Sequence, residues 1–280
     1  MKIVCLIRRG APLNYFVNKI NIEHKVFEVI IERPRSNNYK NFNIKNFTVK
    51  HLYNYFKNRF IKSHKLKNDK AVNIYNKWFS NNWKKLDKTI PSTEVENINS
   101  ESVLNRIKEI NPDLILVHGT SIVKNHIIEN SKLALNLHWG LSPYYRGTHC
   151  TDWALINWDP NNIGVTIHKL TNEIDGGDIL SQKRAKIKSN DTLLSINMQL
   201  TYLGVELINQ AIKKIKQNEK ICFQKQDFSI GYLTYKRQWN FLLKKQIDFI
   251  ENNNLIKKML NKPSRKVNLP IIENFRDKDI

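Results

Sequence analysis

Two apolar, strand-like runs separated by glycine and proline turns constrain this chain most, and both lie between residues 133 and 180. The first run, Leu133 to Leu137, continues into a turn at Ser142-Pro143. Because side chains alternate between the two faces of a strand, Asn136 and His138 are predicted to share one face. An amide and an imidazole are therefore expected side by side at a strand end.

The second run, Gly164 to Leu170, predicts another buried strand. The sequence Asp175-Gly176-Gly177 follows it, and glycine allows the chain to bend sharply there. This turn places a carboxylate within reach of the amide and the imidazole of the first run. The sequence thus predicts that Asn136, His138 and Asp175 meet.

The remaining runs up to residue 215 alternate between strand and helix patterns. The strands are expected at Lys2 to Ile7, Lys25 to Glu32, Leu114 to Val117 and Lys183 to Ile187. The helices are expected at Leu13 to Ile20, Ser100 to Ile110, Asp152 to Trp158 and Asp191 to Ile215. Such alternation is typical of an α/β protein with a doubly wound, mostly parallel, Rossmann-like sheet.

Two regions depart from this rhythm. Residues 33–90 predict a helical insert with helices at Val49 to Ile61 and Ala71 to Trp83, where aromatic residues alternate with lysines. These aromatics could stack on single-stranded nucleic acid, but the i, i+3, i+4 spacing favours packing. We predict a domain over residues 1–215 and a short C-terminal extension over residues 216–280, with a strand at Ile221 to Gln224 and a helical, lysine-rich end.

The composition narrows the classes of protein to which this chain can belong. The formal charge of +21 favours anionic partners, although heavy use of lysine throughout the chain accounts for much of it. Cys5, Cys150 and Cys222 lack the spacing of a zinc site or a disulfide framework, and Cys150 is expected to be a buried thiol rather than a nucleophile. No apolar run reaches 18 residues. We expect a reduced, soluble, cytoplasmic protein without a metal, and we allow for a homodimer.

The motifs around the predicted trio resemble those of the 10-formyltetrahydrofolate-dependent formyltransferases. They are Asn136-Leu137-His138, then Ser142-Pro143-Tyr144-Tyr145-Arg146-Gly147, then Gly164-Val165-Thr166-Ile167-His168 and Asp175-Gly176-Gly177, in the family's order and spacing. The resemblance implies a formyltransferase core over residues 1–215, with N10-formyltetrahydrofolate as the co-substrate. Trp139-Gly140-Leu141 replaces the Pro-Ser-Leu of many members, which leaves the substrate contacts of this loop open.

The resemblance implies catalytic roles for Asn136, His138 and Asp175. Transfer of a formyl group to an amine needs N–H donors for the developing oxyanion and a base for the amine proton. Asn136 and His138 suit the first role and Asp175 the second, and the charge of Asp175 could hold His138 protonated. His168 is expected to support the Asp175 loop. The implied folate contacts are Ser121, Ile122, Val123, Ile174 and Gly176.

The acceptor that the resemblance favours is the amino group of a nucleotide-linked amino sugar. Its expected contacts are Arg8, Arg9 and Gly10, where a strand end and a helix N-terminus could hold phosphate, together with Tyr144, Tyr145, Arg146, Gly147 and Trp153. For the two arginines, plain solvation remains an equal alternative. Glycinamide ribonucleotide, hydroxyornithine and methionyl-tRNA are rival acceptors. From another class, a basic nucleic-acid-binding protein on an inactive formyltransferase scaffold remains an alternative, although we do not expect nucleic acid as a partner.

Overall fold

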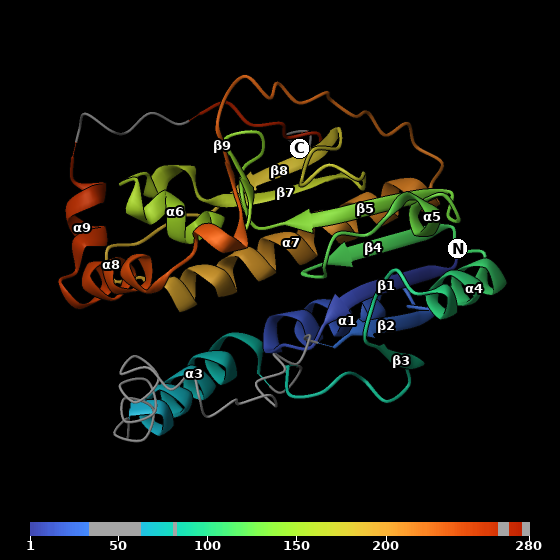
Figure 1. Ribbon diagram of the computed structural model, residues 1–280, viewed down its shortest axis with the longest axis horizontal. Coiled ribbons are helices and arrows are strands. Elements are labelled where there is room, and N and C mark those ends of the chain that lie inside the picture. Colours follow the sequence, from blue (N-terminus) through green and yellow to red (C-terminus); the bar gives the residue numbers. More distant parts are fainter. Residues whose placement is uncertain (34–62, 81–82, 263–268, 276–280) are drawn as a thin grey trace, which may run out of the picture.

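The computed structural model describes residues 1–33, 63–80, 83–262 and 269–275. Its centre is a seven-stranded sheet in the order β3-β2-β1-β4-β5-β7-β8 (Figure 1). The strands are β1 (Ile3–Arg8), β2 (Glu28–Glu32), β3 (Ser92–Val95), β4 (Leu114–His118), β5 (Leu133–His138), β7 (Gly164–Lys169) and β8 (Ile179–Arg184). The pairs from β3 to β5 are parallel, and β7 is antiparallel to both of its neighbours. The predicted doubly wound, mostly parallel class is confirmed.

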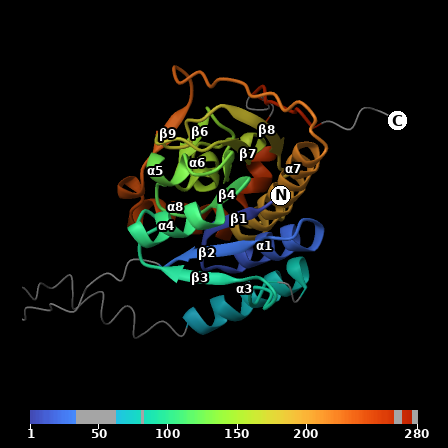
Figure 2. The same cartoon turned by 90° about the vertical axis from the view of Figure 1, so that its right-hand side faces the viewer.

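Helices cover both faces of the sheet, with α1 and α7 on one side and α4 and α5 on the other (Figure 2). The helices are α1 (Ala11–Glu23), α3 (Ser63–Phe79), α4 (Glu101–Ile110), α5 (Asn125–Ile128), α6 (Cys150–Ile156), α7 (Leu193–Lys216), α8 (Phe241–Asn252) and α9 (Leu255–Leu260). Because both faces are covered, the inner strands are continuous apolar runs: every residue of β4, from Leu114 to His118, is buried.

The long helix α7 shows how local sequence sets an element's start. Thr192 is its N-cap and accepts a hydrogen bond from the Ser195 backbone N–H, while the Ser195 hydroxyl accepts from the Thr192 N–H. This reciprocal capping satisfies two donors that a helix start otherwise leaves unpaired. From there α7 runs for 24 residues across the sheet. Its residue Gly204 faces Leu137 of β5.

Several element boundaries differ from the sequence expectation. The strand expected at residues 183–187 is β8, four residues earlier, because its apolar start at Ile179 and Leu180 pairs with β7. The strand expected at residues 221–224 is only an isolated bridge between Gln224 and Ile179. The short strand β3 was not expected. The helix expected at residues 49–61 lies outside the described residues, whereas the one expected at residues 71–83 is α3, shifted toward the N-terminus.

The aromatic residues near the end of α3 pack into the protein. Phe79 is 1% exposed and its ring stacks on Tyr15 of α1, with the centroids 4.1 Å apart. Tyr75 and Trp78 pack against the same apolar core. The packing interpretation of these aromatics, rather than base stacking, is confirmed for the described part of the insert.

Beyond α7 the chain returns to the sheet. Strand β9 (Tyr232–Thr234) pairs in parallel with the short strand β6 (Tyr145–Gly147) and forms a second, two-stranded sheet. Residues 269–274 lie along β8, where the Gln182 N–H donates to Ile272 O at 2.6 Å. The division predicted at residue 215 stays a prediction. Among the described residues, no helix combines the length and the apolar character needed to cross a bilayer.

Candidate active site

The predicted trio meets on one face of the sheet. Asn136 and His138 project from β5 away from α7, because Leu137 between them faces that helix. His168 stands opposite Asn136 on β7 and joins them. Asp175 reaches the same place from the loop between β7 and β8.

Both oxygens of the Asp175 carboxylate are engaged. Asn136 Nδ2 donates to Oδ1 at 3.1 Å, and the backbone N–H of Gly147, in β6, donates to Oδ2 at 2.8 Å. His138 Nδ1 lies 3.3 Å from Oδ2, and His168 Nε2 lies 3.4 Å from Oδ1. Four groups from three separate segments therefore surround one carboxylate.

The charge of Asp175 follows from these contacts. Burial alone would raise its pKa, but the interactions with His138 and His168 and the Gly147 N–H outweigh it. The pKa of Asp175 therefore lies well below its usual range. The carboxylate is ionised at neutral pH although its side chain is only 12% exposed.

His138 is the more deeply buried partner of this pair. Burial lowers its pKa, and the charge of Asp175 and the Tyr145 carbonyl offset only part of that effect. That Asp175 holds His138 protonated stays a prediction. Both ring nitrogens of His138 face an oxygen: Nε2 lies 2.9 Å from Tyr145 O, and Nδ1 faces Asp175 Oδ2.

His168 and Cys150 border the trio. His168 Nδ1 donates to Lys169 O at 2.7 Å, so its Nε2 can accept from Asn136 Nδ2 at 3.0 Å. This geometry suits the supporting role expected of His168. Cys150 Sγ lies 3.6 Å from His138 Nε2, but burial raises the pKa of this thiol strongly. A thiol that stays protonated is a poor nucleophile.

The two segments expected to contact folate lie next to each other. The Asn125 N–H, just after residues 121–123, donates to Asn172 Oδ1 in the Asp175 loop at 3.1 Å. Ile122 is 54% exposed and Val123 is buried, so this segment presents one apolar side chain at the surface. Ser121, however, is bound to Glu32 through both its N–H and its hydroxyl. The folate contacts expected at Ile122, Val123, Ile174 and Gly176 stay predictions, and the polar groups of Ser121 are already engaged.

Some of the residues expected to bind the acceptor contact the trio, whereas others are paired with carboxylates. Tyr145 and Gly147 contact the trio through their backbone, as described above. Arg8 and Arg9 lie at the carboxyl end of β1 and are paired with carboxylates: Arg8 with Glu32 at 3.0 Å and Arg9 with Glu94. A phosphate beside Gly10, the N-cap of α1, would compete with these carboxylates for the guanidinium groups.

The other predicted acceptor contacts face different neighbours. The Tyr144 hydroxyl donates to Pro270 O at 3.0 Å, and Trp153 packs edge-on against Trp239. The Arg146 guanidinium lies 4.2 Å above the Phe228 ring, close to the trio. Sequence reasoning missed Gln226, which donates to the Asp175 and Gly177 carbonyls, because no motif marks it.

His118, at the end of β4, has a structural role in the described contacts. Its Nδ1 donates to Leu137 O at 2.8 Å, and burial lowers its pKa to about 4. The unfolded chain binds more protons between about pH 4 and 6.5, so stability falls as the pH drops through this window.

We expect the free energy of unfolding to fall by about 2 kcal/mol between pH 7 and pH 5 through His118 alone. The variant His118→Gln should lack this part of the decrease. Urea unfolding of both proteins at the two pH values measures the difference. An equal decrease in both proteins would show that His118 is not responsible.

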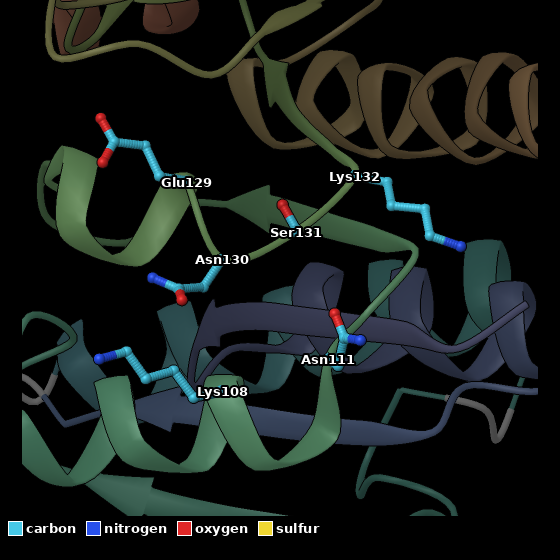
Figure 3. A pocket seen from close by; sticks show the side chains of 6 residues that line it. All are labelled: Lys108, Asn111, Glu129, Asn130, Ser131 and Lys132. Carbon is cyan, nitrogen blue, oxygen red and sulfur yellow. The ribbon is translucent and has the colours of Figure 1, made fainter.

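Neither of two cavities found in the described part of the chain is lined by a residue of the trio. One, of about 320 Å³, lies at the amino ends of β4 and β5 (Figure 3), and it is lined by Lys108, Asn111, Glu129, Asn130, Ser131 and Lys132. The other, of about 420 Å³, lies between the Ser142-Pro143-Tyr144 turn, the segment around Gln226 and residues 270–274. No group of three or more His, Cys, Asp or Glu side chains in the described residues is placed to hold a metal ion.

A doubly wound sheet hosts many unrelated reactions, so the fold alone does not define the class of this protein. The family model described as "Formyl transferase" matches residues 64–212, more than half of the chain. The protein belongs to this formyl transferase family.

Curated relatives match about half of the chain. The bifunctional polymyxin resistance protein ArnA of Wigglesworthia glossinidia brevipalpis is 35% identical over 138 residues, which are 49% of this chain and 21% of that protein. A methionyl-tRNA formyltransferase of Fusobacterium nucleatum is 34% identical over 134 residues, 47% of this chain and 43% of the relative. The chain thus matches less than half of the length of either relative.

Solved structures extend the similarity in fold. A sugar N-formyltransferase from a Shewanella species covers 90% of this chain and 87% of its own, with a TM-score of 0.54 and 19% identity. An N-formyltransferase from Helicobacter canadensis, solved with folinic acid and dTDP-3-aminofucose, covers 86% of this chain and 73% of its own, with a TM-score of 0.51 and 19% identity. At these identities the likeness concerns the fold.

Proposed function

We propose that this protein is an N-formyltransferase that moves the formyl group of N10-formyltetrahydrofolate to the amino group of a nucleotide-linked amino-deoxy sugar, of the dTDP or UDP type. The observation that carries the proposal is the convergence of Asn136, His138 and Asp175 in a member of the formyl transferase family. These side chains supply N–H donors and a proton-accepting pair, the two things that formyl transfer to an amine requires.

The roles proposed for the side chains follow from their chemical types and contacts. When bound, N10-formyltetrahydrofolate supplies the formyl carbon that the acceptor amine attacks. N–H groups of Asn136 and His138 stabilise the negative charge that develops on the formyl oxygen. Asp175 takes the amine proton, and its charge also favours the protonated form of His138. The proton then passes to the nitrogen that leaves the formyl group.

Support for a sugar acceptor comes from two sources. The segment from Leu137 to Gly147 resembles sugar N-formyltransferases in sequence. Similarity in fold to proteins described as sugar N-formyltransferases extends over 85% to 90% of the chain, well beyond the family-matched residues 64–212.

Methionyl-tRNA is the second candidate acceptor. The sequence identity to methionyl-tRNA formyltransferases and the formal charge of +21 favour it, since positive charge attracts a polyanion. It therefore belongs in the same assay.

The purified protein should add a formyl group, seen as a mass increase, to at least one dTDP- or UDP-linked 3-amino or 4-amino sugar in the presence of 10-formyltetrahydrofolate. Methionyl-tRNA, glycinamide ribonucleotide and hydroxyornithine serve as competing acceptors under the same conditions. Formylation of one of these and of no amino sugar would refute the sugar assignment. If no acceptor is formylated while RNA binding falls steeply with salt, the alternative of an inactive nucleic-acid-binding scaffold is favoured.

A further inference from the structure

The turn that carries Asp175 is held by a residue far away in sequence. Gln226 Nε2 donates to Asp175 O at 2.9 Å and to Gly177 O at 2.6 Å, and the residue is 6% exposed. One side-chain amide thus ties together both ends of the bend. Asp175 has a φ of +46°, a left-handed conformation that costs a non-glycine residue about 1 kcal/mol or more. Such a conformation persists only where neighbouring groups fix it, and Gln226 does so.

The carboxylate end of Asp175 depends on the same C-terminal segment. Its partner Gly147 belongs to β6, and β6 is held by β9. Thr234 makes three bonds there: its carbonyl accepts from the Thr148 N–H at 3.1 Å, and its hydroxyl contacts Arg146 O at 3.1 Å and Thr148 O at 2.7 Å. The segment 226–234 therefore supports both the backbone and the carboxylate of Asp175.

The Phe228 ring lies between β6 and the turn that carries Asp175. The Arg146 guanidinium of β6 lies above its ring, and its Cζ would lie 3.4 Å from a Cβ placed on Gly176. The ring thus contacts both the strand that binds the carboxylate and the turn that bears it. Gln226, Phe228 and Thr234 lie beyond residue 212, where the match to the formyl transferase family ends.

We infer that Gln226 is a positioning residue for formyl transfer, and that residues 226–234 of the C-terminal extension form part of the catalytic site. The inference rests on the proposed function. Gln226 acts through the Asp175 turn in two ways: it aims the carboxylate at His138, and it fixes the loop whose residues Ile174 and Gly176 are expected to contact folate.

The test compares Gln226→Met with Gln224→Met. Methionine keeps the length and most of the volume of glutamine but has no N–H donor. Gln224 lies two residues earlier, and its side chain is exposed. Three quantities are measured for the full chain: the affinity for folinic acid, kcat and KM with the acceptor, and Tm.

In Gln226→Met we expect kcat to fall about 100-fold, because a shift of about 1 Å in a catalytic group has an effect of this size. Binding of folinic acid should weaken about tenfold, while the KM for the acceptor stays close to that of Gln224→Met. Tm should fall by only a few degrees, because two carbonyls lose their donor. Unchanged kcat and folinic acid affinity would overturn the inference. So would a loss of kcat that merely follows a loss of folded protein.

The two proposals fail in different ways. A wild-type protein that binds folinic acid but formylates no amino sugar contradicts the proposed acceptor, while the effect of Gln226→Met on folinic acid binding still decides the inference. A wild-type protein that binds no folinic acid contradicts both.

Discussion

Replacing Asp175 with asparagine is expected to lower kcat for formyl transfer by about 10³-fold or more, since both proton transfer and charge stabilisation depend on this carboxylate. The amide keeps the size of the side chain but removes its negative charge. Without that charge, an imidazolium at His138 has no counter-ion in a site where burial already lowers the pKa of His138. The amine proton then has nowhere favourable to go.

The loss should appear in kcat rather than in folate binding. The rate of formyl transfer in a single turnover, with N10-formyltetrahydrofolate and the acceptor both bound, measures this loss directly. Asp178→Asn is the matched control, because Asp178 lies in the same loop, is 43% exposed, and pairs only loosely with Lys169 at 3.7 Å. We expect Asp178→Asn to retain most of the rate. Near-normal transfer by Asp175→Asn would remove the carboxylate from the mechanism.

The second large effect is expected from Gly147→Ala. A Cβ at this position would lie 1.9 Å from Thr234 O, and Gly147 has a φ of +95°, which side chains disfavour. The clash is with backbone, so β6 and β9 must separate. The Gly147 N–H then leaves Asp175, and we expect kcat to fall about 100-fold through misplacement of the carboxylate. The strained backbone should also lower the free energy of unfolding by about 1–3 kcal/mol.

Gly119→Ala separates strain from clash. Gly119 also has a positive φ, +74°, but the nearest atom to its Cβ would be a Leu13 side-chain carbon at 3.5 Å, an ordinary contact. We expect this variant to lose about 1 kcal/mol of stability and to keep most of its activity. Kinetics and urea unfolding of the two variants, measured side by side, make the comparison. Equal losses of activity in both would show that backbone strain, and not the β6–β9 contact, accounts for the effect.

The sequence determined the architecture and the trio because both depend on local patterns. Continuous apolar runs such as Leu114 to Val117 can be buried only in a sheet covered on both faces, and alternation on β5 places Asn136 and His138 on one face. The glycines after Asp175 mark a turn, and this turn brings the Asp175 carboxylate back to Asn136 and His138. Short-range geometry leaves little freedom at these positions.

Only the tertiary structure decided the ionisation of the site residues and the contacts that hold the site in place. The protonation of His138 depends on how deeply β6 and the Asp175 loop bury it, which no spacing of residues predicts. In the same way, the pairing of Arg8 with Glu32 and the bonds from Gln226 to the Asp175 turn join residues 24 and 51 positions apart. Contacts of this kind are set by how the whole chain packs, so no local motif marks them.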